Sequence, residues 1–510
     1  MDTIGNDIFQ SIVDELVNVH DGNSKELAPY AAVSRQWQYA LEKRIFRRCT
    51  LRTYPGELEK FTETYSRYPH RREALRELRF TSNIPRNGNT EEEHQENQDK
   101  FFSDVSTLFA TFRDWEKNEP DTSLVPLHLR VRCCIDTAQN RRVLSEHFAP
   151  SIRPEDLDKL PCIRRITSVD IHHSRRYTIH PHTSGRLLRL MPRVERAAVY
   201  FWDPEIPTSS RGAKRRAIRR AMADCILMIK DSHPGLKSLC VDRYGWQDPE
   251  NHYFMPECLL ENGVDTLCQA IQSLSSLPRL EELKLIDILL SPDLFQDQSK
   301  EEATDGLVAN PWPALKCLEI STECVTADGR WYFTGTPEDI SDNSDFGEDD
   351  DEVATNEFPP PFGRQGRYES PLFPWRFSPD PTTFNPLICG LANMSMHMPK
   401  LELGFFKIRS QSYLSRSLTF QWVSEGSPFE SLTDLNNDPE YIGNWQSRQW
   451  RITVDSGNAT WRPDDEVKEA LEAWSGKGNI IIDRPAAGPQ NSGNLALRLE
   501  DNPAYTHEVL

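Results

Sequence analysis

Apolar residues recur at every fourth position near the start of the chain, which would place them on one side of a helix. These positions are Ile4, Ile8, Ile12 and Leu16. The helix is predicted to begin near Asn6 and to end in the turn-forming residues of 18–24. A second short helix, which carries Leu27, is predicted to follow.

A third short helix is predicted after Val33, because Ser34 is placed to cap it. Its apolar residues share one side and are Trp37, Leu41, Ile45 and Phe46. Three short helices in under 50 residues give only a marginal core, so we expect a partner surface to complete it. The alternative is a small helical cap on the rest of the chain, with Trp37 in its core.

Six later segments begin with a proline. Apolar residues follow this proline two, five or seven positions later in the sequence. The prolines are Pro161, Pro192, Pro234, Pro278, Pro313 and, in a shifted version, Pro399. Helical patterns over 218–229 and 264–274 precede two of these segments. Helix, proline-marked turn and strand, repeated at irregular intervals, predict parallel strands that line one side of a solenoid.

This arrangement resembles an irregular leucine-rich repeat. Segments 75–80 and 127–133 are predicted to be earlier strands of the same array, with a helix over 101–112 between them. The alternative is an ordinary α/β domain in which the leucine spacing is a coincidence. Both interpretations predict an α/β fold with a mainly parallel sheet.

Polar and aromatic segments interrupt this order. Segments 86–100 and 337–357 hold too few apolar residues for a core and are predicted to be loops. The acidic run in the second could recruit a basic partner or simply be solvated surface. Residues 358–381, rich in proline and aromatic side chains, are expected to be extended and packed across the repeats.

The C-terminal part from 448 predicts strand, turn, helix and strand, with Trp450, Trp461 and Trp474 in the core. Such a piece would cap one end of the repeats, because a solenoid end otherwise exposes apolar surface. The pattern is lost near Pro485, and a tail is predicted from there.

Composition narrows the class of protein. The 510 residues are 37% hydrophobic, which is enough for a large core, and the formal net charge of −19 argues against general nucleic-acid binding. The eleven cysteines are scattered, odd in number and without a CxxC pair, which indicates reduced thiols inside the cell. No secretory signal and no run of 18 apolar residues is found, so we predict no membrane span and a cytoplasmic or nuclear location.

The sequence contains no established catalytic motif. Four histidines, His172, His173, His180 and His182, are candidate zinc ligands. However, His180 and His182 flank Pro181 in strand-like sequence, and no cysteine or carboxylate stands beside the four at ligand spacing. The basic run 211–220 could be a nuclear localisation signal or an anion patch, but it overlays an amphipathic helix, and a solvated outer face is favoured. An enzyme with a site assembled only in space stays open.

The first 46 residues resemble an F-box, the module by which substrate receptors dock on the Skp-type adaptor of SCF ubiquitin ligases. The pattern is Ile4-Gly5-x-Asp7-Ile8-x-x-x-Ile12-x-x-x-Leu16, then Leu27, then Val33-Ser34-x-x-Trp37. Its continuation through Glu42 and Phe46 into LRTYPGELEKF and RREALRELRF is similar to F-box proteins of filamentous fungi. Gly5 stands where that family usually has proline, which predicts a looser first contact with the adaptor.

The resemblance implies a non-catalytic protein without a cofactor or metal, the substrate-recognition subunit of an SCF-type ubiquitin ligase. A Skp-type adaptor, and through it a cullin, would bind the F-box, and an unidentified target protein would bind the repeats. The implied adaptor-binding residues are Ile4, Ile8, Ile12, Leu16, Leu27, Val33 and Trp37. The alternative is an interaction scaffold that acts outside a ligase complex.

Five parts of the chain are expected. They are an F-box over 1–50, an irregular repeat region over 51–336, an acidic and proline/aromatic-rich insert over 337–381, the last repeats and a small α/β cap over 382–484, and a tail over 485–510.

Overall fold

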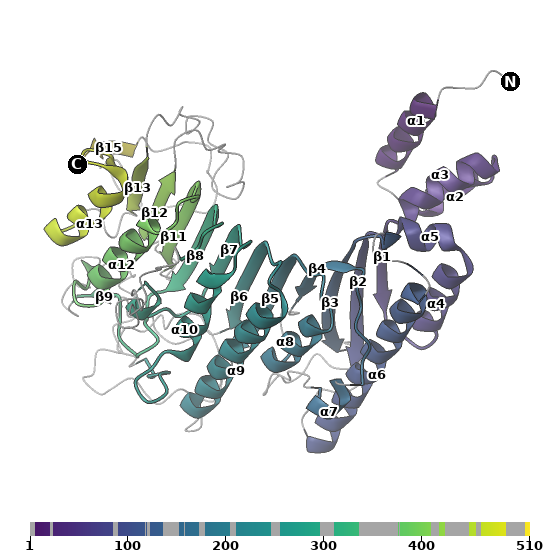
Figure 1. Cartoon of the computed structure of the whole chain (residues 1–510), viewed down its shortest axis with the longest axis horizontal. Coiled ribbons are helices and arrows are strands. Elements are labelled where there is room, and N and C mark those ends of the chain that lie inside the picture. Colours follow the sequence, from purple (N-terminus) through teal and green to yellow (C-terminus); the bar gives the residue numbers. More distant parts are fainter. Residues whose placement is uncertain are drawn as a thin grey trace, which may run out of the picture. The chain divides into compact units, whose positions relative to one another are not determined.

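The computed structural model describes most of the chain in two compact units (Figure 1). Unit 1 comprises residues 1–207 and 224–244, and unit 2 comprises residues 208–223 and 245–510. The residues described are 6–20, 24–84, 90–117, 119, 123–135, 152–157, 159–172, 179–203, 211–245, 256–295, 311–335, 376, 378–409, 418–423, 448–454, 461–485 and 505–509. The fold is mixed α/β, and its strands pair mainly in parallel.

Unit 1 begins with the three predicted short helices. They are α1 (Asn6–Val19), α2 (Ser24–Ala31) and α3 (Arg35–Ile45). Ser34 caps α3 as predicted, because its hydroxyl accepts the backbone N–H of Trp37 at 3.3 Å.

The strands of unit 1 follow one another in chain order. They are β1 (Arg48–Arg52), β2 (Glu77–Ile84), β3 (Leu127–Ile135), β4 (Ile166–Ile171), β5 (Arg196–Asp203) and β6 (Ser238–Gly245). Neighbours from β1 to β5 are parallel, with Leu51 opposite Phe80 and Phe80 opposite Val131. The strand predicted at 127–133 is thus confirmed, and the one predicted at 75–80 exists but begins two residues later, at Glu77, after the end of α5.

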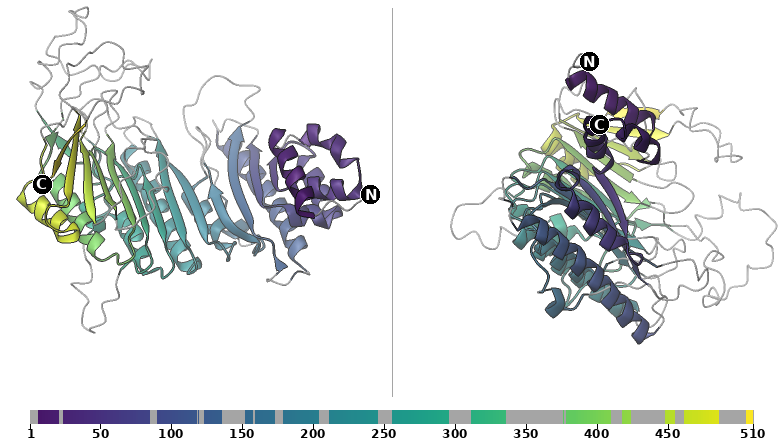
Figure 2. Two further views of the ribbon diagram at one scale, coloured as in Figure 1. Left: turned by 90° about the horizontal axis from the view of Figure 1, so that it is seen from above. Right: turned by 90° about the vertical axis from the view of Figure 1, so that its right-hand side faces the viewer.

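Helices cover one face of these strands, and no helix of the described residues covers the other, which is called here the open face (Figures 1 and 2). They are α4 (Glu57–Arg67), α5 (Pro69–Ala74), α6 (Glu91–Glu116), α7 (Pro154–Leu157), α8 (Pro181–Arg189) and α9 (Arg211–Ser232), of which α9 contributes to both units. Residues of β2 alternate accordingly, with Leu78 and Phe80 buried and Glu77 and Arg79 facing outward.

The proline marker has a structural cause. Five strands start four residues after their proline, at Arg196, Ser238, Glu282, Cys317 and Leu403. In four of them, the carbonyl before the proline accepts an N–H three residues on: Met191 O from Val194 N, His233 O from Leu236 N, Trp312 O from Leu315 N and Met398 O from Leu401 N. Proline therefore occupies the second position of a β-turn, where its fixed φ is favourable, and the next apolar side chain enters the core.

Unit 2 has parallel and antiparallel pairs. Its strands are β7 (Glu282–Ile286), β8 (Cys317–Glu323), β11 (Leu403–Arg409), β12 (Leu418–Val423), β13 (Gln449–Val454), β14 (Ile480–Pro485) and β15 (Tyr505–Val509), with a separate pair β9 (Phe333–Thr334) and β10 (Ser378–Pro379). The pairs β7–β8, β8–β11 and β13–β14 are parallel, whereas β11–β12, β12–β13 and β14–β15 are antiparallel.

The helices of unit 2 include those that the sequence predicts. They are α10 (Thr266–Ser273), η2 (Leu274–Ser276), η3 (Pro292–Phe295), α12 (Phe384–Met396) and α13 (Asp465–Ser475). The order β13, α13, β14 matches the predicted C-terminal strand, helix and strand. Trp450 and Trp474 are buried with their ring centroids 5.5 Å apart, and the half-buried Trp461 packs on Phe384 and Phe420.

Three sequence predictions need correction or completion. Residues 91–100, predicted to be loop, are the start of α6, where the Thr90 hydroxyl accepts the N–H of Glu93. Residues 505–509, in the predicted tail, form β15 beside β14. Of the insert 337–381, only 376 and 378–381 lie within the described residues; there β10 pairs with β9, and Arg376 lies over the Trp331 ring at 5.1 Å.

The basic run 211–220 is only partly a solvated face, which corrects the preferred interpretation. Arg219 is buried and donates to both carboxylate oxygens of Asp265 at 2.8 and 2.9 Å, and to the carbonyl of Leu289 at 2.8 Å. Arg215 is also buried, and its Nη1 lies 3.7 Å from a Glu257 oxygen. Lys214 and Arg220 are exposed. Arg219 and Asp265 therefore tie α9 to α10 within unit 2.

Candidate functional site

The first three helices have a small core of their own. Its buried residues are Phe9, Val13, Leu27, Ala40 and Leu41, and Leu16, Val17, Ala31, Trp37 and Ile45 pack against them. The rings of Phe9 and Trp37 meet edge to face, with their centroids 5.2 Å apart. Among the described residues of these helices, this core buries five apolar side chains, so it is as small as the sequence predicts.

The same helices expose an unusual share of large apolar side chains. Of the ten such residues in the described part of the chain, six lie within residues 8–39. They are Ile8, Ile12, Val19, Tyr30, Val33 and Tyr39, called here the N-terminal apolar set. Apolar side chains concentrated in one exposed segment are typical of an interaction surface.

The predicted adaptor-binding residues fall into three groups. Ile8, Ile12 and Val33 are exposed, at 61%, 42% and 67% of their full area. Leu16 and Trp37 are half-buried against the small core. Leu27 is fully buried, so it supports the surface from beneath and does not line it. Ile4 lies outside the described residues.

The spacing of the isoleucines identified the exposed face of α1, which carries Ile8 and Ile12, but not the face that packs into the small core. Phe9 and Val13 enter the core, one position after Ile8 and Ile12. A helix turns about 100° per residue, so the two pairs point in clearly different directions. The aromatic residue Phe9 was the sequence signal for the core-facing side of α1, and it packs against Trp37.

A buried ion pair holds α3 on α5. Glu42 of α3 accepts hydrogen bonds from Arg71 Nε at 2.8 Å and Arg71 Nη2 at 2.7 Å, and its other contacts are His70 Nε2 at 2.6 Å and Gln38 Nε2 at 3.0 Å. The hydrogen bonds from Arg71 are the main reason that the pKa of Glu42 falls from 4.5 to about 2. Arg71 also stacks on the Phe46 ring, 4.4 Å from its centroid.

A second ion pair joins α3 to α1. Arg44 Nε donates to Asp14 at 2.6 Å, and this hydrogen bond is the main reason that the pKa of Asp14 is lowered. Both partners are partly exposed, so the pair orients the helices more than it stabilises them. Together with the Ser34 cap, these contacts fix the helix that carries Trp37 and Tyr39.

The open face of the unit 1 strands is a second candidate surface, and it is rich in arginine. Glu77 on β2 lies 3.3 Å from Arg48, 2.9 Å from Arg79 and 3.4 Å from Arg130. Because three strands each contribute an arginine around one carboxylate, this face carries positive charge within an acidic chain.

The arginine-rich face continues onto β4. Asp170 lies 3.2 Å from Arg130 and 3.1 Å from His128. Burial alone would raise the pKa of Asp170, but His128 and Arg130 outweigh it and lower this pKa. His172 stacks on Tyr200 of β5, with the ring centroids 4.1 Å apart. Arginine and aromatic side chains are enriched at protein interfaces, which makes this face a candidate contact surface.

The histidine-rich segment does not form a metal site among the residues described, where no three His, Cys, Asp or Glu side chains converge. His180 begins α8 and accepts the N–H of His182, which corrects the strand-like interpretation of these positions. Burial, with a smaller contribution from His182, lowers the pKa of His180 to about 4. His173 lies outside the described residues.

No protein-family model matches the chain, and no curated protein matches its sequence. Within the described residues, no helix is both long enough and apolar enough to span a membrane.

Proposed function

We propose that this protein is the substrate-recognition subunit of an SCF-type ubiquitin ligase. Helices α1–α3 act as an F-box that binds a Skp-type adaptor, and the strands that follow hold a target protein. The observation that carries the proposal is the exposure of Ile8, Ile12 and Val33 on a segment whose described residues bury only five apolar core side chains. These three residues belong to the pattern that resembles the F-box.

The contacts of α3 support this proposal. Glu42 and Phe46 belong to the part of the sequence that is similar to F-box proteins of filamentous fungi. Both contact Arg71, Glu42 through an ion pair and Phe46 through its ring. This arrangement fixes α3 on α5 while Tyr39 of α3 stays exposed. A rigidly held apolar surface loses little conformational entropy on binding, which favours docking of a partner.

We further propose that the helix, proline turn and strand units are irregular leucine-rich repeats. The β-turns after Met191, His233, Trp312 and Met398 support this interpretation, because the same local geometry starts each strand. The arginine-rich open face of unit 1 is the proposed contact for the target, and it favours a target segment with acidic residues.

The protein would need no catalytic residue for this function. A receptor that binds adaptor and target at the same time raises the effective concentration of the target near the ubiquitin-conjugating enzyme. The bond chemistry then belongs to other subunits of the ligase.

The test is a binding assay between this chain and a purified fungal Skp-type adaptor. Ile8→Asp/Ile12→Asp would place two charges in an apolar interface without partners, so we expect binding to be lost. The matched control is Ser11→Asp/Asn18→Asp, which adds the same charge at exposed polar positions of α1 and should bind as wild type does. Equal adaptor binding by both double variants would contradict the proposal.

A second measurement separates the ligase subunit from a scaffold. Adaptor-bound protein should recover cullin and support ubiquitin transfer to a bound target. A complex that contains the adaptor but never cullin would instead identify an interaction scaffold outside the ligase.

A further inference from the structure

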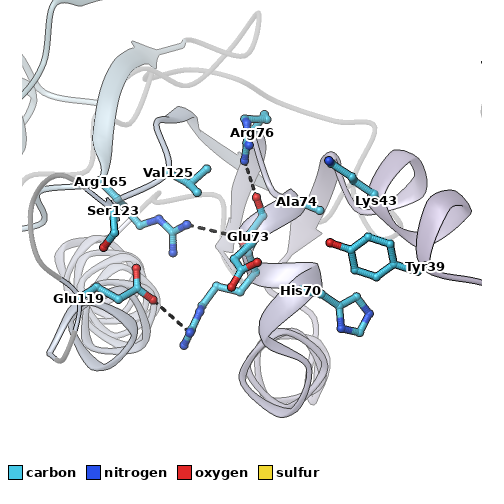
Figure 3. A pocket seen from close by; sticks show the side chains of 11 residues that line it. Tyr39, Lys43, His70, Glu73, Ala74, Arg76, Glu119, Ser123, Val125 and Arg165 are labelled. Carbon is cyan, nitrogen blue, oxygen red and sulfur yellow. Dashed lines mark hydrogen bonds and ion pairs between the residues drawn. The ribbon is translucent and has the colours of Figure 1, made fainter. Parts of the chain in front are cut away.

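A cavity of about 580 Å³ lies in unit 1, beside the start of β2 (Figure 3). Its walls come from α3, from α5 and the residues after it, from the segment that follows α6, and from Arg165 just before β4. Cavities of about 300–1,000 Å³ are typical of small-ligand sites, so this one could hold more than a single ion.

The lining residues carry an excess of positive charge. Four of them are cations, Lys43, Arg72, Arg76 and Arg165, and two are carboxylates, Glu73 and Glu119, which leaves a difference of two positive charges. Arg72 is paired with Glu119 at 3.0 Å. Arg76 donates to the carbonyls of Glu73 and Leu75. No carboxylate of the described residues is in direct contact with its guanidinium. The excess is notable because the whole chain has a formal charge of −19.

Arg165 is the residue that points to a ligand. Its side chain is 2% exposed, yet Nε and Nη1 have no hydrogen-bond partner among the described residues. Its Nη2 makes one long bond, 3.4 Å to the carbonyl of Arg72. Buried polar groups are normally hydrogen-bonded, so a buried guanidinium with two free nitrogens indicates an absent partner.

Neighbouring groups position Arg165 but do not satisfy it. The ring of Trp115 lies under its guanidinium at 5.2 Å. The buried carboxylate of Glu116 is directed to the backbone, where it accepts the N–H groups of Arg164 at 3.0 Å and Arg165 at 2.8 Å. Figure 3 shows the Arg165 side chain extending into the cavity, with Arg76 above it and Glu119 below.

We propose that this cavity binds a phosphate monoester dianion, with Arg165 and Arg76 as its principal donors. A guanidinium presents a planar fork that matches phosphate oxygens, and two excess charges match a dianion. The remaining volume accommodates the organic group that the phosphate carries. The cavity shares Tyr39 with the N-terminal apolar set, but the proposal rests on Arg165 and Arg76 and does not depend on the F-box assignment.

The test measures binding of inorganic phosphate to the full chain at low salt, by the line width of its ³¹P resonance and by thermal stabilisation. We expect wild type to broaden the resonance and to gain stability. Arg165→Gln and Arg76→Gln should each weaken binding about tenfold or more. Arg76 is exposed, so its variant keeps the test valid even where Arg165→Gln folds poorly.

The matched control is Arg67→Gln, which removes an exposed arginine on α4 outside the cavity and should leave binding unchanged. A sharp phosphate resonance with wild type, or equal weakening by Arg67→Gln and Arg76→Gln, would overturn the proposal.

Two competitors distinguish the sources of such a group. Glycerol 3-phosphate represents small phosphorylated molecules, and a short peptide with one phosphoserine represents a modified protein. The competitor that displaces inorganic phosphate at the lower concentration identifies the source, and failure of both to displace it would show that the monoester assignment is wrong.

Discussion

The carboxylate of Glu42 on α3 accepts two hydrogen bonds from the guanidinium of Arg71 on α5, at 2.8 and 2.7 Å. Glu42 is buried, and Arg71 is mostly covered by Phe46 and Tyr68. The pair connects α3, one of three helices with a small core, to α5, which precedes β2. It therefore decides how firmly the N-terminal apolar set is held.

Glu42→Gln should lower the free energy of unfolding of this region by about 1–3 kcal/mol, since it leaves Arg71 without its counter-charge. The value is below that of a fully buried pair, because His70 and Arg71 are partly exposed. Hydrogen exchange of amides 35–45 measures the effect. Glu63→Gln is the control, because Glu63 and its partner Arg67, 4.0 Å away, are exposed; similar effects of both variants would refute the prediction.

Stability should depend on pH through the same pair. The pKa of Glu42 is lowered, so its ionised form is favoured in the folded state. Its contribution is therefore complete above pH 4.5 and is lost as the pH falls toward 2. The difference in unfolding free energy between wild type and Glu42→Gln should shrink across this window. A difference that stays constant from pH 5 to about 2 would contradict it.

The two faces of α1 should respond differently to truncation. Phe9→Ala removes a buried ring from a small core and should destabilise α1–α3 by about 3 kcal/mol. Ile8→Ala removes an exposed side chain and should change stability by less than about 0.5 kcal/mol. Hydrogen exchange within residues 6–45 compares them. Equal destabilisation would mean that α1 packs its Ile8 face inward, as in the helical-cap alternative.

In unit 2, Arg219→Met should cost about 3–5 kcal/mol, because it leaves the buried Asp265 charge without a partner. Adding Asp265→Asn should restore at least about 1 kcal/mol, since asparagine is neutral and can still accept the N–H of Cys268 that Asp265 caps. Thermal or denaturant unfolding measures both variants. The control is Arg220→Met on the exposed side of α9; a double variant less stable than Arg219→Met would disprove the account.

Gly404→Ala should prevent normal folding of the β11–β12 pair. Gly404 on β11 faces Trp422 on β12, and a Cβ at Gly404 would lie 1.6 Å from the indole ring. Because Trp422 is fully buried and cannot move aside, we expect a loss above about 4 kcal/mol or no soluble protein. Gly235→Ala, where a Cβ meets no atom within 4 Å, is the control. Normal thermal stability of Gly404→Ala would contradict the packing.

The sequence by itself determined the elements that depend on neighbours along the chain. Ser34 marks the start of α3 because a hydroxyl can reach an N–H three residues on. The prolines mark the strands because a fixed φ favours the turn before each one. Alternating apolar residues mark β2 and β13, since a strand with one open face repeats every two residues.

Only the tertiary structure decided which partners meet across the sequence. Arg219 belongs to a basic run that is typical of a solvated face, but it is buried because Asp265, 46 positions away, supplies its counter-charge. Arg165 has no local signal for the cavity it lines, whose walls come from separate elements. Phe9, and not Ile8, enters the core because Trp37 lies opposite it. Local patterns fix backbone conformation over a few residues, whereas burial and pairing of charges depend on groups that only folding brings together.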